Sequence, residues 1–224
     1  MKNIILSCEH GGYDIPSNYQ KYFTRFQDKL RTHISWDRGA LELAKYFQVK
    51  LNSDLHYSTI SRLLIEQNRS ITEPELFSSI SKDFTDVQKN KLKEEIYIPY
   101  VNTIDGLIQK QITAHKLTYH LSIHSFTPIL NGVRRDAEIG ILFDPKNPTE
   151  LSYANAWMHS IQTKMPNWRI KFNYPYLGID DGLTTHFRNK YPTTYAGLEL
   201  EVNNQLFEDY SLERLGKLLL PPKI

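Results

Sequence analysis

Short apolar runs and longer amphipathic stretches alternate along the whole chain. The short runs, which are apolar throughout or alternate between apolar and polar residues, predict strands at 3–8, 57–65, 118–123, 138–143, 168–172 and 196–202. Apolar residues that recur three or four positions apart predict helices from about 37, between about 86 and 115, from about 149 and from 211. This alternation predicts a three-layer α/β/α fold around a mixed, mostly parallel sheet. No repeat or linker interrupts the pattern, so we expect a single domain over residues 1–224.

Polar residues and prolines indicate where the predicted helices begin and bend. Ser35 or Asp37 can cap the first helix and Thr149 the third, because such side chains accept the free N–H groups of a first turn. Pro99 is expected to kink or split the second helix. The polar segment 71–90 is expected to be an excursion on the surface.

Composition and charge narrow the class of protein. With 224 residues, of which 40% are hydrophobic, the chain can bury a core without disulfides or structural metals, so any metal is expected to be catalytic. The net charge of +2 argues against a nucleic-acid partner. Cys8 is the only cysteine, which excludes an intramolecular disulfide and favours a reducing compartment. The N-terminal apolar stretch is too short for a secretory signal, and none approaches the roughly 20 residues of a membrane span, so we expect a cytoplasmic protein without a membrane partner.

Histidines and glutamates fall where predicted strands end. His10 follows the first strand, and His124 follows the strand that ends at Ile123. Glu199 and Glu201 lie in the last strand, where period-two alternation places both on one face. Ligands of open α/β sheets collect beyond the carboxyl ends of the strands. Imidazoles and carboxylates that meet there suit a catalytic zinc ion, with three protein ligands, an open position for water, and a further carboxylate that moves a proton.

A second polar cluster lies in the segment SRLLIEQNRS, which contains Arg62, Asn68 and Arg69. Arginine side chains bind carboxylates through paired hydrogen bonds, so this cluster can hold a carboxylate of a substrate. The alternative is a surface patch of salt bridges, which composition alone would favour.

A set of segments, in order and spanning Cys8 to about Leu206, resembles the N-formylglutamate amidohydrolase family: CEHGG…IP, WDRGA, SRLLIEQNRS, HSFTP, EIGILFD, NYPY and LELEVN. HSFTP and SRLLIEQNR are the most specific of these matches. The family in turn resembles the zinc carboxypeptidases, in which two histidines bind zinc, an Asn-Arg pair holds the substrate carboxylate and a glutamate in a strand is catalytic. The resemblance therefore implies a zinc-dependent amidohydrolase that acts on linear amides.

For the metal, the resemblance implies a zinc site with His10 and His124 as its two histidines. The carboxypeptidase-type glutamate three residues after the first histidine is absent, because Tyr13 stands there. Other carboxylates compete for the third ligand position, in which Asp37 is favoured over Glu9 and Asp14.

For the substrate, the resemblance implies that Asn68 and Arg69 hold a carboxylate, with Arg62 as a second cation. Arg135 and Tyr176 match less specific segments of the family and are given supporting roles in substrate binding. The expected partner is thus a small molecule that carries a carboxylate.

For the chemistry, Glu201 resembles the catalytic glutamate, with Asn203 where an arginine is usual in the carboxypeptidase-type strand. Glu199 shares its face and is expected to support the site rather than act on water. The implied reaction is hydrolysis of an N-acyl amino acid of the N-formylglutamate type, to formate and glutamate.

Two alternatives to this function stay open. The same machinery could act on a peptide, like a zinc carboxypeptidase, or on another N-acyl amino acid. The chain could also be an inactive homologue that binds a carboxylated metabolite. The joint presence of His10, His124 and Glu201 argues against inactivity.

Overall fold

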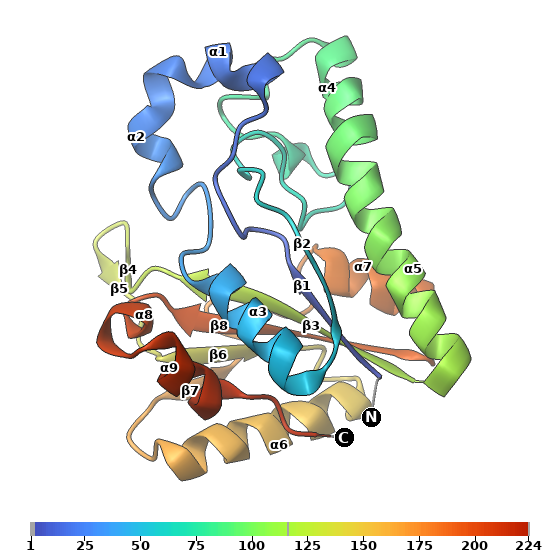
Figure 1. The fold of residues 1–224 in the computed structure, drawn as a ribbon, viewed down its shortest axis with the longest axis vertical. Helices are drawn as coiled ribbons and strands as arrows, with labels where there is room; N and C mark the ends of the chain where they lie inside the picture. Colours follow the sequence, from blue (N-terminus) through green and yellow to red (C-terminus); the bar gives the residue numbers. More distant parts are fainter. Residues whose placement is uncertain (1–2, 116, 224) are drawn as a thin grey trace.

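A sheet with the strand order β2-β1-β3-β8-β6-β7 runs through the computed structural model, which describes residues 3–115 and 117–223 (Figure 1). Its strands are β1 (Ile4–Cys8), β2 (Asp54–Tyr57), β3 (Thr118–Phe126), β6 (Ile139–Leu142), β7 (Ile170–Phe172) and β8 (Tyr195–Asn203). The first three and β8 are parallel to one another, whereas β6 and β7 run antiparallel to them. The predicted mixed, mostly parallel sheet is therefore confirmed. A separate hairpin pairs β4 (Ile129–Leu130) with β5 (Val133–Arg134).

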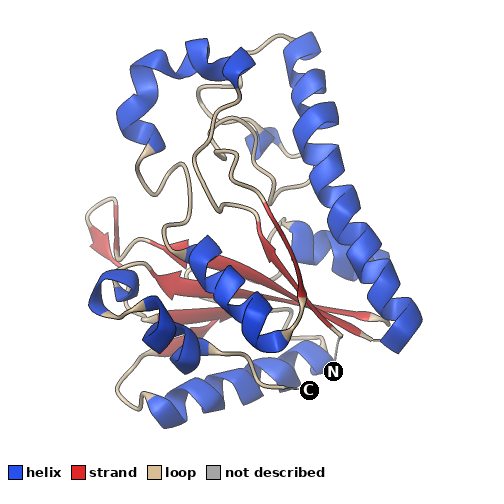
Figure 2. Ribbon diagram, in the orientation of Figure 1, coloured by secondary structure: helices blue, strands red, loops and turns tan. Residues whose placement is uncertain are grey.

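Helices cover both faces of the sheet (Figure 2). One layer consists of α3 (Ala40–Leu51), α6 (Pro148–Lys164) and α9 (Leu212–Leu219), which share a hydrophobic core with β1, β3, β6 and β8. The other layer consists of α5 (Ile98–His115) and α7 (Leu183–Lys190), which pack against β1 and β8. The predicted three-layer architecture is therefore confirmed.

The alternation of side chains along β8 separates the core from the polar face. Leu198 and Leu200 are buried in the core that contains α3, α6 and α9. Glu199 and Glu201 consequently point to the face that carries α5 and α7. On that face the register of β3 and β8 pairs His124 with Glu201. The sheet itself thus places an imidazole beside a carboxylate.

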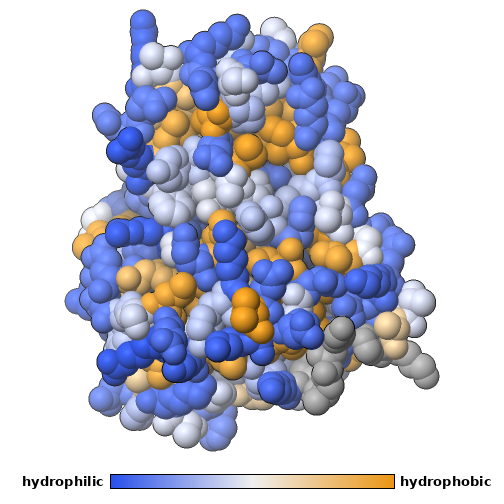
Figure 3. Space-filling view, in the orientation of Figure 1, coloured by the Kyte–Doolittle hydropathy of each residue, from blue (hydrophilic) through white to orange (hydrophobic). Residues whose placement is uncertain are grey.

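A second hydrophobic core lies beyond the sheet, in the upper part of Figure 1. It is built from α1 (Gln20–Phe23), α2 (Gln27–Leu30), α4 (Asp86–Leu92) and the chain that leads into α4. Apolar side chains show between these helices in Figure 3. Leu76 and Phe84 are buried in this core. The prediction that 71–90 lies only on the surface is therefore wrong, because isolated apolar residues anchor this polar segment.

The long helix predicted between 86 and 115 is interrupted, as expected from Pro99. A π-helical turn over Lys93–Tyr97 separates α4 from α5, and Pro99 is the second residue of α5. Proline lacks the N–H of an ordinary helical hydrogen bond, and a wider turn before it accommodates that loss. None of the helices in the described part of the chain is long and apolar enough to cross a membrane.

The strand predicted over 57–65 is wrong, because β2 ends at Tyr57. The hydroxyl groups of Ser58 and Ser61 accept hydrogen bonds from the backbone N–H groups two residues further on. Such local bonds compete with the ladder of a sheet and turn the chain. The apolar residues 63–65 then pack in the second core instead of extending the strand.

The predicted caps of two helices are also wrong. Gly39 precedes α3 and makes no side-chain cap, while Ser35 bonds to another serine and Asp37 faces the sheet edge. Asn147, rather than Thr149, caps α6, because its side-chain oxygen accepts the N–H groups of the first turn. The helix from Ser211 is confirmed, whereas α7 had no counterpart in the pattern.

Residues 173–178, between β7 and α7, form a wall that is packed tightly on β6. The side-chain oxygen of Asn173 accepts hydrogen bonds from the backbone N–H groups of Phe143 and Gly178, each 3.0 Å long. A Cβ atom at Gly140 would collide with the carbonyl oxygen of Tyr174, and one at Gly178 would collide with the backbone of Phe143. Glycine is required at both positions because backbone meets backbone there. We call residues 173–178 the glycine-packed wall.

Candidate active site

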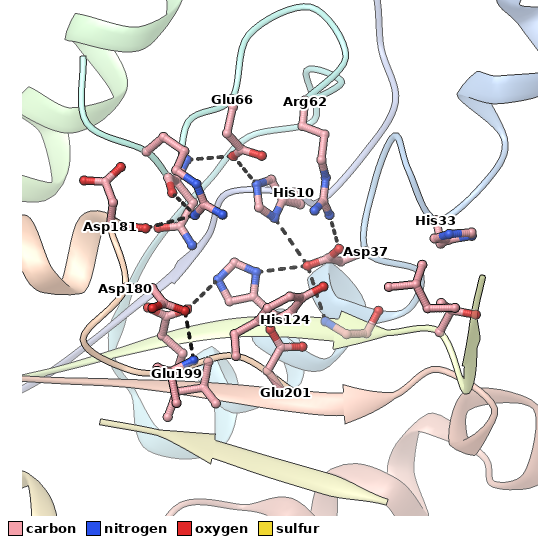
Figure 4. A pocket seen from close by; sticks show the side chains of 18 of the residues that line it. His10, His33, Asp37, Arg62, Glu66, His124, Asp180, Asp181, Glu199 and Glu201 are labelled. Carbon is pink, nitrogen blue, oxygen red and sulfur yellow. Dashed lines mark hydrogen bonds and ion pairs between the residues drawn. The ribbon is translucent and has the colours of Figure 1, made fainter. Parts of the chain in front are cut away.

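A cavity of about 160 Å³ lies beyond the carboxyl ends of β1, β3 and β8 (Figure 4). Its lining includes all the residues that the sequence singled out for catalysis, metal binding and substrate binding: His10, Asp37, Arg62, Asn68, Arg69, His124, Arg135, Tyr176 and Glu201. They come from strand ends, from the loops after β1 and β2, and from the glycine-packed wall. Segments far apart in sequence thus converge on one pocket.

His10, Asp37 and His124 are buried together at the base of this cavity. The Asp37 Oδ2 atom lies 2.9 Å from His124 Nδ1 and 3.4 Å from His10 Nδ1. A hydrogen bond of 2.9 Å from the Asp37 backbone N–H to the His10 carbonyl fixes the loop that carries the aspartate. One donor atom from each residue lies within 4.8 Å of the others, so this group could bind a metal ion.

The outer nitrogens of both imidazole rings are held by further polar groups. His10 Nε2 lies 2.5 Å from Glu66 Oε1. His124 Nε2 lies 2.8 Å from Ser122 Oγ and 3.2 Å from Glu9 Oε2. An outer N–H on each ring leaves the Nδ1 lone pair directed at the shared centre, as metal-binding histidines require.

The charges around this centre fit a cation. The carboxyl groups that surround it belong to Glu9, Asp37, Glu66, Glu199 and Glu201, and the guanidinium of Arg62 forms an ion pair with Asp37. Burial alone would raise the pKa of Asp37, but the charges of Arg62 and His10 hold that pKa well below its usual range. Burial alone would lower the pKa of His124, but hydrogen bonds with Asp37 and Glu9 raise that pKa well above its usual value. The donor set of two imidazoles and a carboxylate in this negative surrounding is suited to a divalent metal.

Geometry distinguishes the three carboxylates that compete for the third ligand position. Asp37 lies against the inner nitrogens of both histidines. Glu9 lies on the outer side of His124. Asp14 is bridged through its backbone to Ile60 and does not line the cavity. Of the three, only Asp37 is placed to share a metal with the histidines.

The segment that contains Asn68 and Arg69 presents hydrogen-bond donors to the cavity. The Asn68 Oδ1 atom accepts the backbone N–H of Leu183, at 2.8 Å, so the carbonyl end of this amide is already used. Arg69 Nη1 donates to the carbonyls of Asn68 and Asp181, each at 2.9 Å. Among the described residues, no carboxylate forms an ion pair with Arg69. Its charge is therefore fixed in place without being neutralised.

Two further arginines line the cavity differently. Arg62 forms an ion pair with Asp37, so its guanidinium is directed at the candidate metal centre. Arg135 lies at the mouth, stacked against the rings of Phe126 and Tyr176, and donates a 3.0 Å hydrogen bond to the Tyr176 hydroxyl. Arg62 therefore places its charge at the inner end of the cavity, whereas Arg135 places its charge at the rim.

Glu199 and Glu201 have different surroundings although they share a face of β8. Glu199 accepts a 2.6 Å hydrogen bond from the Thr184 hydroxyl, and its other oxygen lies 3.7 Å from His124 Nε2. Glu201 is 4% exposed, and its Oε2 atom has no hydrogen-bond partner in the described residues. Burial, opposed by the charge of His124, raises the pKa of Glu201 to about 8. A buried carboxyl group with a free oxygen beside the candidate metal centre can exchange protons with a ligand.

Some site residues were not selected from the sequence. Glu66 lies in the SRLLIEQNRS segment, two residues before Asn68, and could have been noticed there as a nearby carboxylate. Ser122 lies two residues before His124, so period-two alternation in β3 already placed both on one face. Asp181 has no such signal, because it approaches Arg69 and Ser70 only through the fold.

Comparisons with known proteins identify the family and the fold of this chain. A family model described as N-formylglutamate amidohydrolase matches residues 2–208. The solved structure of a gene product from Agrobacterium tumefaciens is 25% identical, with a TM-score of 0.80 over 97% of this chain and 89% of that chain. The structure of an N-formylglutamate amidohydrolase from Ralstonia eutropha shares the fold, with 15% identity and a TM-score of 0.70 over 98% and 92% of the two chains. No curated protein matches the sequence at a significant level.

Proposed function

Because this chain belongs to the N-formylglutamate amidohydrolase family, we propose that it is a zinc-dependent enzyme that hydrolyses N-formylglutamate or a close N-acyl amino acid. The observation that carries the proposal is the buried group of His10, Asp37 and His124 beside Glu201, whose Oε2 atom accepts no hydrogen bond from any described residue. We place the reaction in the cytoplasm and assign it to one catalytic domain over residues 1–224.

In this proposal His10, Asp37 and His124 hold the zinc ion. Bound zinc would polarise the scissile carbonyl and lower the pKa of water. Arg62, through its contact with Asp37, adds positive charge near the carbonyl oxygen, where negative charge develops during the attack of water.

Glu201 is the general base of the proposed reaction. The charge of a bound zinc ion would lower the pKa of this carboxyl group from the value of about 8 that burial gives it, and so favour the ionised form. The ionised Oε2 atom takes a proton from the attacking water, whose oxygen forms a bond to the carbonyl carbon. The same carboxyl group then passes the proton to the amide nitrogen as the carbon–nitrogen bond breaks. The products are a carboxylate, which is formate for a formyl substrate, and a free amino acid.

The amino-acid part of the substrate is held by its carboxylate. Asn68 and Arg69 supply the donors, because Asn68 has only its N–H₂ end left and Arg69 forms an ion pair with no carboxylate of residues 3–115 and 117–223. Arg135 and Tyr176, which are already bonded to each other at the rim, support the outer part of the substrate. This arrangement selects a small molecule with a carboxylate.

Replacing Arg69 with alanine should raise KM for N-acyl amino acids. A carboxylate that loses its charged partner in a buried site costs on the order of 2–5 kcal/mol. The kcat should fall as well if the same contact orients the scissile bond. Steady-state kinetics on a substrate that the wild type hydrolyses would measure both changes.

Arg25→Ala provides the matched control for this experiment, because Arg25 is exposed on the turn Thr24–Phe26 and does not line the cavity. It should behave as the wild type does. Kinetics of Arg69→Ala equal to those of the control would show that Asn68 and Arg69 form only a structural patch.

Replacing Glu66 with glutamine should weaken zinc binding about 10- to 100-fold, the usual cost of losing an outer partner of a metal-binding histidine. The 2.5 Å contact with His10 Nε2 is the reason, since an amide group accepts this N–H less strongly than a carboxylate does. Competition with a chelator of known affinity would give the change. Zinc affinity equal to that of the wild type would mean that Glu66 stabilises the loop but does not affect metal binding.

Metal analysis of the purified protein, combined with a screen of N-acyl amino acids and peptides, tests the proposal as a whole. We expect about one zinc per chain and turnover of N-formylglutamate or a related N-acyl amino acid. Preference for peptides would favour a carboxypeptidase-like function. Binding without turnover would favour an inactive homologue, and absence of both zinc and binding would exclude the proposal.

A further inference from the structure

Glu9 is a buried carboxylate that lies behind the candidate metal centre and is not among its inner donors. Its side chain is fully buried, in the turn that directly precedes His10. Its two oxygens accept from the Ser122 hydroxyl at 2.5 Å and from the Tyr100 hydroxyl of α5 at 3.2 Å. Its Oε2 atom also lies 3.2 Å from His124 Nε2.

These contacts form a short chain that ends on His124. The hydroxyl of Ser122 donates to Glu9, so its oxygen is free to accept the Nε2–H of His124 at 2.8 Å. The Glu9 Oε2 atom itself lies 3.2 Å from the same nitrogen. On the opposite side of the ring, His124 Nδ1 lies 2.9 Å from Asp37. Acceptors therefore lie at both nitrogens of the ring. If a metal occupies the Nδ1 side, the proton of the neutral imidazole lies on Nε2, which faces Ser122 and Glu9.

We propose that Glu9 is a positioning residue, which keeps His124 in the tautomer and orientation that direct its Nδ1 lone pair at the metal. This inference rests on the proposed zinc site. A histidine can bind a metal only through an unprotonated nitrogen, and the hydrogen bond on the other nitrogen decides which one that is. Since Glu9 and His10 are adjacent, one turn supplies both a ligand and the orientation of a second ligand.

Glu199 is the other carboxylate near the outer side of His124, and its geometry is weaker. Its nearer oxygen is 3.7 Å from His124 Nε2, which is beyond hydrogen-bond length, and its other oxygen is bonded to Thr184. Tyr100 anchors Glu9 from α5, on the side away from His124. The orientation of His124 therefore depends on Glu9 and Ser122 more than on Glu199.

The test is Glu9→Gln. If the glutamine oxygen takes the place of Oε2, it faces Ser122 and His124 as a weaker acceptor than a carboxylate; if the N–H₂ group takes that place, it cannot accept at all. In either orientation the tautomer with its proton on Nε2 loses support, so the other tautomer gains and blocks the metal. We expect zinc affinity, measured by chelator competition, to fall about 10- to 100-fold. We also expect the visible absorption bands of the cobalt(II)-substituted protein to shift, because the ligand field changes.

Tyr100→Phe is the matched control, since it removes a hydrogen bond from Glu9 without touching His124. It should lower the thermal midpoint of the metal-free protein and leave zinc affinity and the cobalt spectrum close to those of the wild type. If Glu9 only stabilised the fold, Glu9→Gln would likewise lower the thermal midpoint without changing zinc affinity or the cobalt spectrum.

Ser122→Ala keeps the inference testable if Glu9→Gln does not fold, because it removes the bridging hydroxyl and should also weaken zinc binding. Wild-type affinity in either folded variant, with an unchanged cobalt spectrum, would overturn the role of Glu9 and leave the proposed function intact. Failure of the wild-type protein to bind zinc would overturn both.

Discussion

Glu201→Gln should lower kcat at least about a hundredfold, because a positioned carboxylate that transfers a proton contributes typically 10²–10⁴-fold. Glutamine keeps the shape of the side chain but cannot accept the proton from water. The Oε2 atom forms no hydrogen bond with the part of the chain that the structure describes, so the substitution breaks no hydrogen bond of that oxygen there. Zinc content should stay at the wild-type level, since Glu201 is not one of the donors grouped around Asp37. Single-turnover kinetics with a metal assay on the same sample would measure both.

Glu199→Gln is the matched control, with the same change on the same face of β8. It alters a side chain that is already bonded to Thr184, so its effect on kcat should be smaller. If Glu199→Gln proved the more damaging of the two, or if Glu201→Gln lost its zinc, the roles of the two glutamates would have to be reassigned.

His124→Ala should abolish stable zinc binding. Three protein ligands leave no spare donor, so the loss should exceed the roughly 10- to 100-fold that removal of an outer partner costs. Zinc content after dialysis, measured by elemental analysis, should fall far below one ion per chain, and hydrolysis should fall with it.

His120→Ala is the control for this second experiment. His120 lies on the same strand and face, is equally buried, and bonds to Ser7 and Tyr195 instead of the metal group. Its removal should lower the free energy of unfolding but leave zinc bound. A His124→Ala protein that kept nearly one zinc per chain would contradict the assigned ligand set.

The parts of the fold that follow from local patterns could be predicted. The apolar runs located β1, β3, β6, β7 and β8 to within a few residues. Alternation alone placed Glu199 and Glu201 on one face of β8. The convergence of His10 and His124 follows from the parallel pairing of β1 with β3, because their carboxyl ends lie at the same edge.

The parts that depend on distant partners could not be predicted. Asp37 stands just before a helix, where a cap is the local expectation, yet its side chain turns to His10, His124 and Arg62. The attraction of these buried charged groups exceeds the benefit of a cap, which is worth about 1 kcal/mol. For this reason the sequence alone could not separate Asp37 from the other candidates for the third ligand, whereas the structure distinguishes them by position.

The strand predicted over residues 57–65 was wrong for a related reason. Its apolar residues are compatible with a strand, and periodicity cannot tell which core they join. Residues 63–65 pack in the second core, and this brings Arg62 to Asp37 and Glu66 to His10. A residue such as Glu66 acquires its place only once the two cores are assembled.

The glycine-packed wall, residues 173–178, means that the pocket selects by exclusion. Its main chain is packed against Gly140 of β6 and, at Gly178, against the main chain of Phe143 just after β6, so an oversized ligand cannot push it back. The position of the backbone therefore sets the width of the pocket on this side. Replacing single side chains elsewhere should not change that width. The wall contributes the side chains of Tyr176 and Leu177 to the lining of the cavity. Variants that accept bulkier ligands, natural or engineered, should therefore have smaller residues at these two positions.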